Sequence, residues 1–224
     1  MKYFVMPVLL GLFILLGSVN ARAVPTVSEM NRLQSATALF EQMPGMIPPY
    51  VLRHAQGIAV IPGELKAGFI FGGELGNGVM VARLPNGRWS APSFITMGGA
   101  NWGAQIGGEV RNIVLIFNTP ASVALAESGN LTLGAGASIT AGPVGTGLGV
   151  NTRMPAVYSY VSSAGAYVGA TLNGSVLATD YGANRDVYGM ANPLRLRASA
   201  APGATRSFTC SIARATGASE RVCG

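Results

Sequence analysis

The sequence contains few of the residues that build catalytic and metal centres. Its 224 residues include one histidine, His54, and two cysteines, Cys210 and Cys223. A zinc finger or a two-histidine metal site needs more ligands than these, so both kinds of site are excluded. A hydrolytic triad would have to use His54, and the G-x-S-x-G motif that presents a nucleophilic serine does not occur. We therefore expect no enzyme activity, no metal and no cofactor.

Charged residues are also scarce, and their distribution argues against nucleic-acid binding. Lys, Arg, Asp and Glu make up 11% of the chain, and the formal net charge is +6. Between residues 24 and 189 basic and acidic residues are equal in number, so the positive excess lies in Lys2, Arg22 and the segment after Gly189. A nucleic-acid surface needs basic side chains gathered on one folded face. We therefore exclude nucleic acid as a partner.

The first 23 residues have the features of a signal peptide. Lys2 precedes an apolar run over 3–17, and Ala21-Arg22-Ala23 fits the small-residue cleavage pattern. The run has about 15 residues, fewer than the ~20 that a membrane-spanning helix requires. We expect cleavage near Ala23 and export to the periplasm or to another part of the cell envelope. An uncleaved membrane anchor is the alternative.

Two helices are expected after the signal peptide. Thr26-Val-Ser-Glu29 matches a capping box, and apolar residues recur at helical spacing from Met30 to Phe40. Pro44-Gly45 ends this helix. A second, shorter helix is expected between Pro48-Pro49 and Gly57.

Glycine is abundant and indicates a β-rich region after residue 57. The chain has 31 glycines, about twice the average share of ~7%, without a G-X-Y period. Short apolar runs are separated by Gly, Asn and Pro, and Pro85-Asn86-Gly87 predicts a hairpin. The expected strands are 58–61, 67–71, 78–82, 88–90, 94–97, 102–106, 113–117, 131–140, 157–161, 167–172 and 176–178.

One short helix is expected to interrupt these strands. Thr119 can act as its N-cap with Pro120 as the first helical residue. The run 113–117 before it is apolar on both faces, which is typical of a central strand. A last helical turn is expected at 183–187. The predicted fold class is α+β, with N-terminal helices, a Gly-rich, mainly antiparallel, closed or nearly closed β-sheet and one inserted short helix.

A series of short motifs lies between residues 55 and 189. They are AQGIAVIP (55–62), KAGFIFGG (66–73), GVMVAR (78–83), GRWSAP (87–92), GGANWGAQIG (98–107), LTLG (131–134), AGPVG (141–145), YSY (158–160) and YG (188–189). In number and order these motifs resemble the SYLF domain family, which is related to yeast actin-patch regulators and also occurs in bacterial envelope proteins. The resemblance covers roughly residues 30–190, and we assign 24–191 as a SYLF-like domain.

The resemblance implies a non-catalytic domain that binds membrane lipid, with phosphoinositides as the ligands of eukaryotic members. Those members contact the membrane through a basic N-terminal helix, whereas residues 27–43 here contain only Arg32 beside Glu29 and Glu41. Each basic residue near an anionic surface contributes about 1 kcal/mol, so we expect little dependence on anionic lipid. The predicted function is an exported lipid-binding domain of the envelope. The alternative is an envelope module that binds another protein on the same scaffold.

Five residues are candidates for lipid contact. Arg53, Lys66 and Arg88 are predicted to form a small basic rim, with a solvated loop lysine as the alternative for Lys66. Trp89 and Trp102 are the only tryptophans, and indole rings favour the membrane interface. A buried tryptophan with a bonded N–H is the alternative for Trp89.

The segment 192–224 lies beyond the resemblance and carries the remaining positive charge. It is rich in Ala, Ser, Thr, Gly and Arg, and it contains both cysteines. In an oxidising compartment Cys210 and Cys223 can pair. The segment is therefore either a disulfide-tied appendage or a flexible basic arm, and its deletion is expected to remove the salt-sensitive part of lipid binding.

Overall fold

The computed structural model describes residues 27–43, 45–129, 131–143, 154–163, 166–168, 172–219 and 223. Within the strands, the side chains of 66–72, 100–108, 163 and 166–168 are outside this description. The predicted signal peptide, residues 1–23, also lies outside the described residues.

The helices follow the expected order, with one addition. They are α1 (Val27–Glu41), α2 (Pro49–His54), α3 (Pro120–Glu127), α4 (Tyr181–Tyr188) and α5 (Arg206–Thr216), with short 3-10 turns at Ala198–Ala200 and Gly203–Thr205. Thr119 caps α3, because its hydroxyl accepts a hydrogen bond from the Ser122 N–H at 3.1 Å. The predicted helices are therefore confirmed, and α5 was not predicted.

Seven strands form one mainly antiparallel sheet, which confirms the α+β class. They are β1 (Gly57–Ala82), β2 (Ser93–Phe117), β3 (Leu131–Thr132), β4 (Ile139–Ala141), β5 (Val157–Ser163), β6 (Ala166–Val168) and β7 (Val176–Thr179). The order is β3-β7-β2-β5-β4, with β1 on β2 and β6 on β5, and only β4 and β5 pair in parallel. The described strands thus follow an open path from β3 to β4, not a closed one.

Two strands are much longer than the sequence patterns predict. The runs expected at 58–61, 67–71 and 78–82 are all parts of β1, and those at 94–97, 102–106 and 113–117 are all parts of β2. The β1–β2 ladder continues through the Gly-rich connections, with Gly72 opposite Asn101 and Gly76 opposite Met97. Glycine weakens a strand interior, but it keeps the backbone N–H and C=O groups that pair in a ladder, so these glycines do not end the strands.

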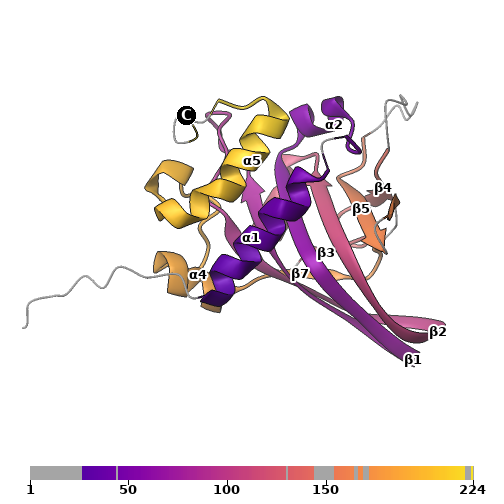
Figure 1. Ribbon diagram of the computed structural model, residues 1–224. Helices are drawn as coiled ribbons and strands as arrows, with labels where there is room; N and C mark the ends of the chain where they lie inside the picture. Colours follow the sequence, from indigo (N-terminus) through magenta and orange to yellow (C-terminus); the bar gives the residue numbers. More distant parts are fainter. Residues whose placement is uncertain are drawn as a thin grey trace, which may run out of the picture.

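Each long strand also folds back on itself. The Arg83 N–H donates to the Gln56 carbonyl at 2.7 Å, so the two ends of β1 lie together. A Cβ atom at Gly78 would lie 2.5 Å from the Val60 carbonyl oxygen, and this close approach requires glycine. We call residues 62–77 of β1 and 98–111 of β2 the ribbon; Figure 1 shows the two strands extending together beyond the helices.

Outside the ribbon, the central part of the sheet, formed by the ends of β1 and β2, is buried on both faces and forms the body of the molecule. Alternate residues such as Ile58 and Val60 face α1, α2, α4 and α5, whereas Ala59 and Ile61 face α3 and the segment around β3 and β4. All five residues of 113–117 are completely buried, which confirms that this run is central.

The C-terminal segment is part of this core. Phe208 and Ile212 of α5 are completely buried against α1, α2 and the sheet. Cys210 and Cys223 form a disulfide, as predicted. The interpretation of 192–224 as an appendage or flexible arm is wrong. The segment lies outside the range of the family resemblance, but its apolar side chains Phe208 and Ile212 are part of the core.

Candidate functional site

The predicted basic rim is centred on an arginine that the sequence analysis did not single out. The Arg83 side chain donates from Nε to the Ala55 carbonyl at 2.8 Å, from Nη1 to the Gly87 carbonyl at 3.1 Å and from Nη2 to the Arg53 carbonyl at 3.5 Å. Burial lowers the pKa of Arg83. Arg83 thus joins the end of α2 to the 84–88 hairpin, and its donors are used within the protein.

Trp89 lies behind this arginine and does not reach the surface. Its ring is completely buried, with the Arg83 guanidinium 4.6 Å from the ring centroid. The indole Nε1–H donates to Thr216 Oγ1 at 2.9 Å. Trp89 is therefore wrong as a lipid-contact candidate, and the alternative of a buried, hydrogen-bonded tryptophan is what the structure shows.

The three predicted rim residues do not all come together. Arg53 is exposed at the end of α2, and Arg88 is partly exposed in the 84–88 hairpin. Arg83 links these two places, because it donates hydrogen bonds to the carbonyls of Arg53 and Gly87. Lys66 lies opposite Glu109 in the ribbon, roughly 30 Å along an extended strand from the start of β1. The side chains of Lys66 and Trp102 are outside the described part. The rim is thus reduced to Arg53 and Arg88.

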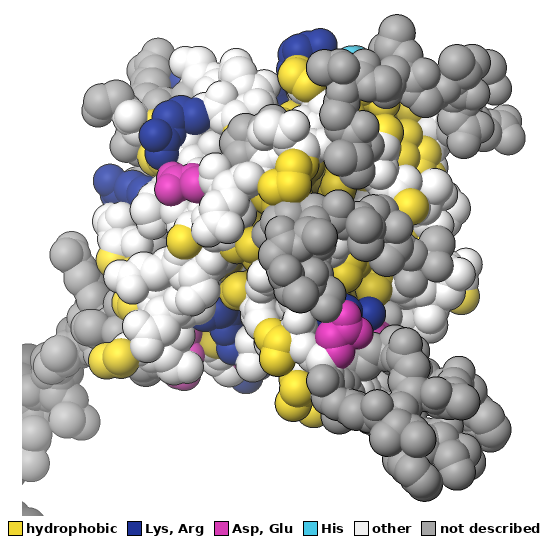
Figure 2. All heavy atoms as spheres, turned by 45° about the vertical axis from the view of Figure 1, so that its right-hand side comes forward, with side chains coloured by type: hydrophobic (Ala, Val, Ile, Leu, Met, Phe, Trp, Pro, Cys, Tyr) yellow, Lys and Arg dark blue, Asp and Glu magenta, His cyan; other side chains and the backbone are white. Residues whose placement is uncertain are grey.

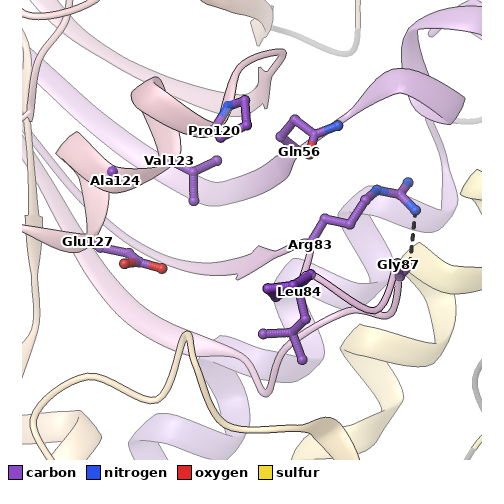
Figure 3. A pocket seen from close by; sticks show the side chains of 9 residues that line it. Gln56, Arg83, Leu84, Gly87, Pro120, Val123, Ala124 and Glu127 are labelled. Carbon is purple, nitrogen blue, oxygen red and sulfur yellow. Dashed lines mark hydrogen bonds between the residues drawn. The ribbon is translucent and has the colours of Figure 1, made fainter.

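A pocket of about 440 Å³ lies beside this rim (Figure 3). Gln56, Arg83 and Leu84 line one side, and Pro120, Val123, Ala124 and Glu127 of α3 line the other. The Glu127 carboxylate pairs with Arg195 at 3.2 Å. Because the one lining cation is already hydrogen-bonded and a carboxylate faces it, this pocket does not suit a phosphate headgroup.

Charge is buried at a second place, the base of the ribbon. Arg111 donates to both carboxylate oxygens of Glu64 at 2.8 Å and to Glu74 Oε2 at 3.0 Å. All three side chains are buried, and the Ser175 hydroxyl donates to the other Glu74 oxygen. Burial by itself lowers the pKa of Arg111, but hydrogen bonds and charges from Glu64 and Glu74 raise it above its ordinary value.

Apolar side chains occupy the opposite face of the same strands. Leu65 is 51% exposed and pairs across the ladder with Val110, which is 61% exposed. Leu75 is 73% exposed. We call these three residues the outer face. The sequence analysis did not identify these three residues. Each follows or precedes a charged residue in its strand (Glu64, Arg111 or Glu74), and this alternation of apolar and charged residues is visible in the sequence. Only the structure shows that the charged side of the strand is the buried one.

Other cations near the surface are either paired or scattered. Arg32 of α1 pairs with Asp180 at 3.0 Å and lies over the Phe94 ring, so α1 is a packed helix. On the face shown in Figure 2, the Lys and Arg side chains of the described residues lie in small separate groups, some of them with acidic side chains nearby. A continuous basic surface for anionic headgroups is not visible on this face.

Among the residues that the structure describes, no helix is both long and apolar enough to cross a membrane.

Comparisons with known proteins agree with the motif resemblance. A family model, Ysc84, described as "Las17-binding protein actin regulator", matches residues 98–205. Protein YSC84 of Saccharomyces cerevisiae is 43% identical over 150 residues, which is 64% of this chain and 32% of the yeast protein. The human SH3 domain-containing YSC84-like protein 1 is 41% identical over 147 residues, which is 64% of this chain and 43% of the human protein.

The chain spans less than half the length of these relatives. The family match includes β2 from residue 98 and the motifs that follow, and it ends at residue 205, just before α5. The order of these motifs along the sequence and their place in one continuous sheet lead to the same conclusion. The chain therefore contains a domain of the Ysc84/SYLF family, which the family model matches over residues 98–205.

Proposed function

We propose that the protein is a non-enzymatic lipid-binding domain that associates with membranes without a specific anionic headgroup. The family resemblance suggests lipid as the ligand, and the relatives carry names that describe binding rather than catalysis. The observation that carries the proposal is the distribution of charge. Arg83 and Arg111 bond inward, which leaves only Arg53 and Arg88 at the rim, while aliphatic side chains face solvent on the ribbon.

We also propose that the protein is exported to the periplasm or to another part of the envelope. Support comes from the apolar run over 3–17, followed by the cleavage pattern at Ala23. The Cys210–Cys223 disulfide adds to it, because structural disulfides persist in oxidising compartments. N-terminal sequencing of the protein isolated from its native compartment tests this; a chain that still begins at Met1 would refute cleavage.

A flotation experiment with liposomes tests lipid binding. The protein is incubated with vesicles of phosphatidylcholine alone and with vesicles that also contain phosphatidylserine, at low and high salt. We expect flotation with phosphatidylcholine alone, because residues 24–189 carry no net charge. The positive charge after Gly189 should add only a small gain with phosphatidylserine, and high salt should remove that gain. Binding to neither composition would refute the proposal, and binding to anionic vesicles alone would refute its independence of headgroup.

A protein-interaction role is the second candidate. The names of the relatives, which include LAS seventeen-binding protein 3, favour it. On this chain, the pocket between the 84–88 hairpin and α3 offers a surface of mixed character for a polypeptide. A partner that is recovered with the protein in lipid-free buffer, and that binds again as a purified protein, would favour this role over lipid binding.

A further inference from the structure

The ribbon reverses the usual distribution of side chains between inside and outside. Soluble proteins place apolar side chains inside and leave charges in water, and Glu and Arg are almost never fully buried unless they are paired. At the base of the ribbon Glu64, Glu74 and Arg111 are inside, while Leu65 and Leu75 are outside. This reversal needs an explanation, because burying the leucines and exposing the charges would suit water better.

The reversal follows from the two-residue period of the strands. Side chains of neighbouring residues point to opposite faces of a strand. Glu64 and Glu74 lie in the two halves of β1 and both bond to Arg111, so the inward faces of the two halves meet at this arginine. Leu65 and Leu75 come directly after these glutamates, and they therefore point outward from both halves of the ribbon.

The outer face offers apolar contact and little else. Leu65, Leu75 and Val110 have purely aliphatic side chains, and their backbones belong to the β1–β2 ladder, with Leu65 opposite Val110 and Leu75 opposite Gly98. Glu64, Arg111 and Glu74, one direct neighbour of each, are turned inward and paired. A partner that binds here gains free energy mainly through burial of apolar surface.

We propose that the outer face of the ribbon, formed by Leu65, Leu75 and Val110, enters the acyl region of a lipid bilayer and provides the protein's main membrane contact. This inference rests on the proposed lipid-binding function and names the surface responsible for it. The buried Glu64–Arg111–Glu74 cluster supports the ribbon from inside, so that apolar side chains are presented outward from a firm base.

The geometry favours a lipid surface over a protein partner or a second copy of the chain. Three partly exposed aliphatic side chains offer only a few hundred Å² of apolar surface, whereas a stable protein interface buries about 800 Å² on each partner. The ribbon projects beyond the helices (Figure 1), and exposed aliphatic side chains lie on both of its halves. This arrangement suits immersion in a fluid environment better than contact with one flat partner.

Two triple variants of the full chain test the proposal. The first, Leu65→Gln/Leu75→Gln/Val110→Thr, makes the outer face polar. The matched control, Leu125→Gln/Met154→Gln/Met190→Gln, changes three apolar side chains outside the ribbon that are 39%, 40% and 41% exposed. Partitioning onto phosphatidylcholine vesicles is measured by flotation, and circular dichroism verifies folding.

We expect the ribbon variant to lose at least about tenfold in partition coefficient, because its three substituted side chains no longer gain free energy by leaving water. The control should partition like the wild type. If the wild type binds and the ribbon variant binds equally well, the inference is overturned and the lipid-binding function stands. If the wild type binds no vesicle, both fail. If the ribbon variant only loses self-association, measured by light scattering, the outer face is a contact between copies and the inference is overturned.

A second measurement does not depend on the triple variant being folded. Leu75→Trp and, as its control, Leu125→Trp each add one indole to the wild-type background. In vesicles with brominated acyl chains, the additional fluorescence of Leu75→Trp should be quenched and that of Leu125→Trp should not. Equal quenching of the two, or quenching of neither, would overturn the proposed insertion.

Discussion

The helix-covered body and the ribbon distribute polar and apolar side chains in opposite ways. In the body, alternate residues of the strands are buried against apolar neighbours on both faces, as with Val114 and Leu115. In the ribbon, one face of the same two strands holds buried charges and the other holds exposed aliphatic side chains. The same pair of strands thus forms part of the hydrophobic core at one end and exposes aliphatic side chains to solvent at the other.

Each region contains an arginine that joins distant parts of the chain, partly buried Arg83 in the body and buried Arg111 in the ribbon, but their partners differ. Arg83 in the body donates to carbonyl oxygens and stacks on Trp89, so no ionised partner depends on it. Arg111 in the ribbon bonds two carboxylates. Removing Arg111 leaves buried charges without their counter-ion, whereas the bonds around Arg83 are between a cation and neutral groups. The ribbon is therefore the more sensitive region to the loss of a single charge.

The largest effect is expected from ending the chain after Thr205, which removes α5. The core loses Phe208 and Ile212, and truncation of one large buried side chain alone costs about 3–5 kcal/mol. The sum approaches the whole stability of a typical domain, about 5–15 kcal/mol. We expect no cooperative unfolding transition by urea and circular dichroism. A truncated chain that unfolds cooperatively near the wild-type midpoint would show that the body is complete without α5.

Arg111→Met should have the next largest effect. Removing one partner of a buried ion pair costs about 3–5 kcal/mol, because the other charge remains buried. The control is the triple variant Arg111→Met/Glu64→Gln/Glu74→Gln, which removes every charge of the cluster and should recover much of the loss. Urea unfolding of the three proteins measures this. If the triple variant is less stable than Arg111→Met, the cluster depends on hydrogen bonds more than on charge balance.

Reduction of the disulfide should have a moderate effect that is limited to the body. Cys210 and Cys223 are separated by 13 positions, and a loop of about this length gives about 3 kcal/mol on the chain-entropy model. We expect Cys210→Ser/Cys223→Ser to lower the thermal midpoint while vesicle binding by the ribbon stays unchanged. A loss of vesicle binding at temperatures where the variant is folded would show that the two regions are coupled.

Much of the body could be predicted from the sequence, because local patterns determine it. The apolar run 113–117 indicates a central strand, and Thr119-Pro120 indicates a helix start; both are confirmed. Helix α5 was missed because its composition resembles a flexible arm, although Phe208 and Ile212 have helical spacing. Apolar periodicity in a segment rich in Ala, Ser and Thr is therefore informative even when the average composition is not.

The ribbon could not be predicted, because it depends on pairing between distant residues. Glu64 and Arg111 are 47 positions apart, and only the strand register brings them together. The glycines at 72, 73 and 76 indicated a turn, whereas the ladder extends through them. The missing register also explains why Arg53 and Lys66 were grouped in one rim. The sequence does not show that β1 runs unbroken through Lys66 and carries it away from the end of α2.

Alkaline titration should give the smallest effect and separate the two regions again. Burial raises the pKa of Tyr160 and Tyr188, both in the body, above the usual 10.0. A folded-state pKa above the unfolded value means that these groups contribute stability below pH 10, which is lost as pH rises further. The pKa of Arg111 is also raised, so the ribbon cluster keeps its cation over this range.

Tyr160→Phe sharpens this test. The variant loses the hydrogen bond from the Tyr160 hydroxyl to the Pro143 carbonyl, 3.1 Å long, and should be about 1 kcal/mol less stable at pH 8. Above pH 10 the difference from the wild type should shrink, because the variant has no hydroxyl at this position to ionise on unfolding. Urea midpoints between pH 8 and pH 11 measure both effects. A difference that stays constant over this range would mean that burial of Tyr160 does not couple its ionisation to folding of the body.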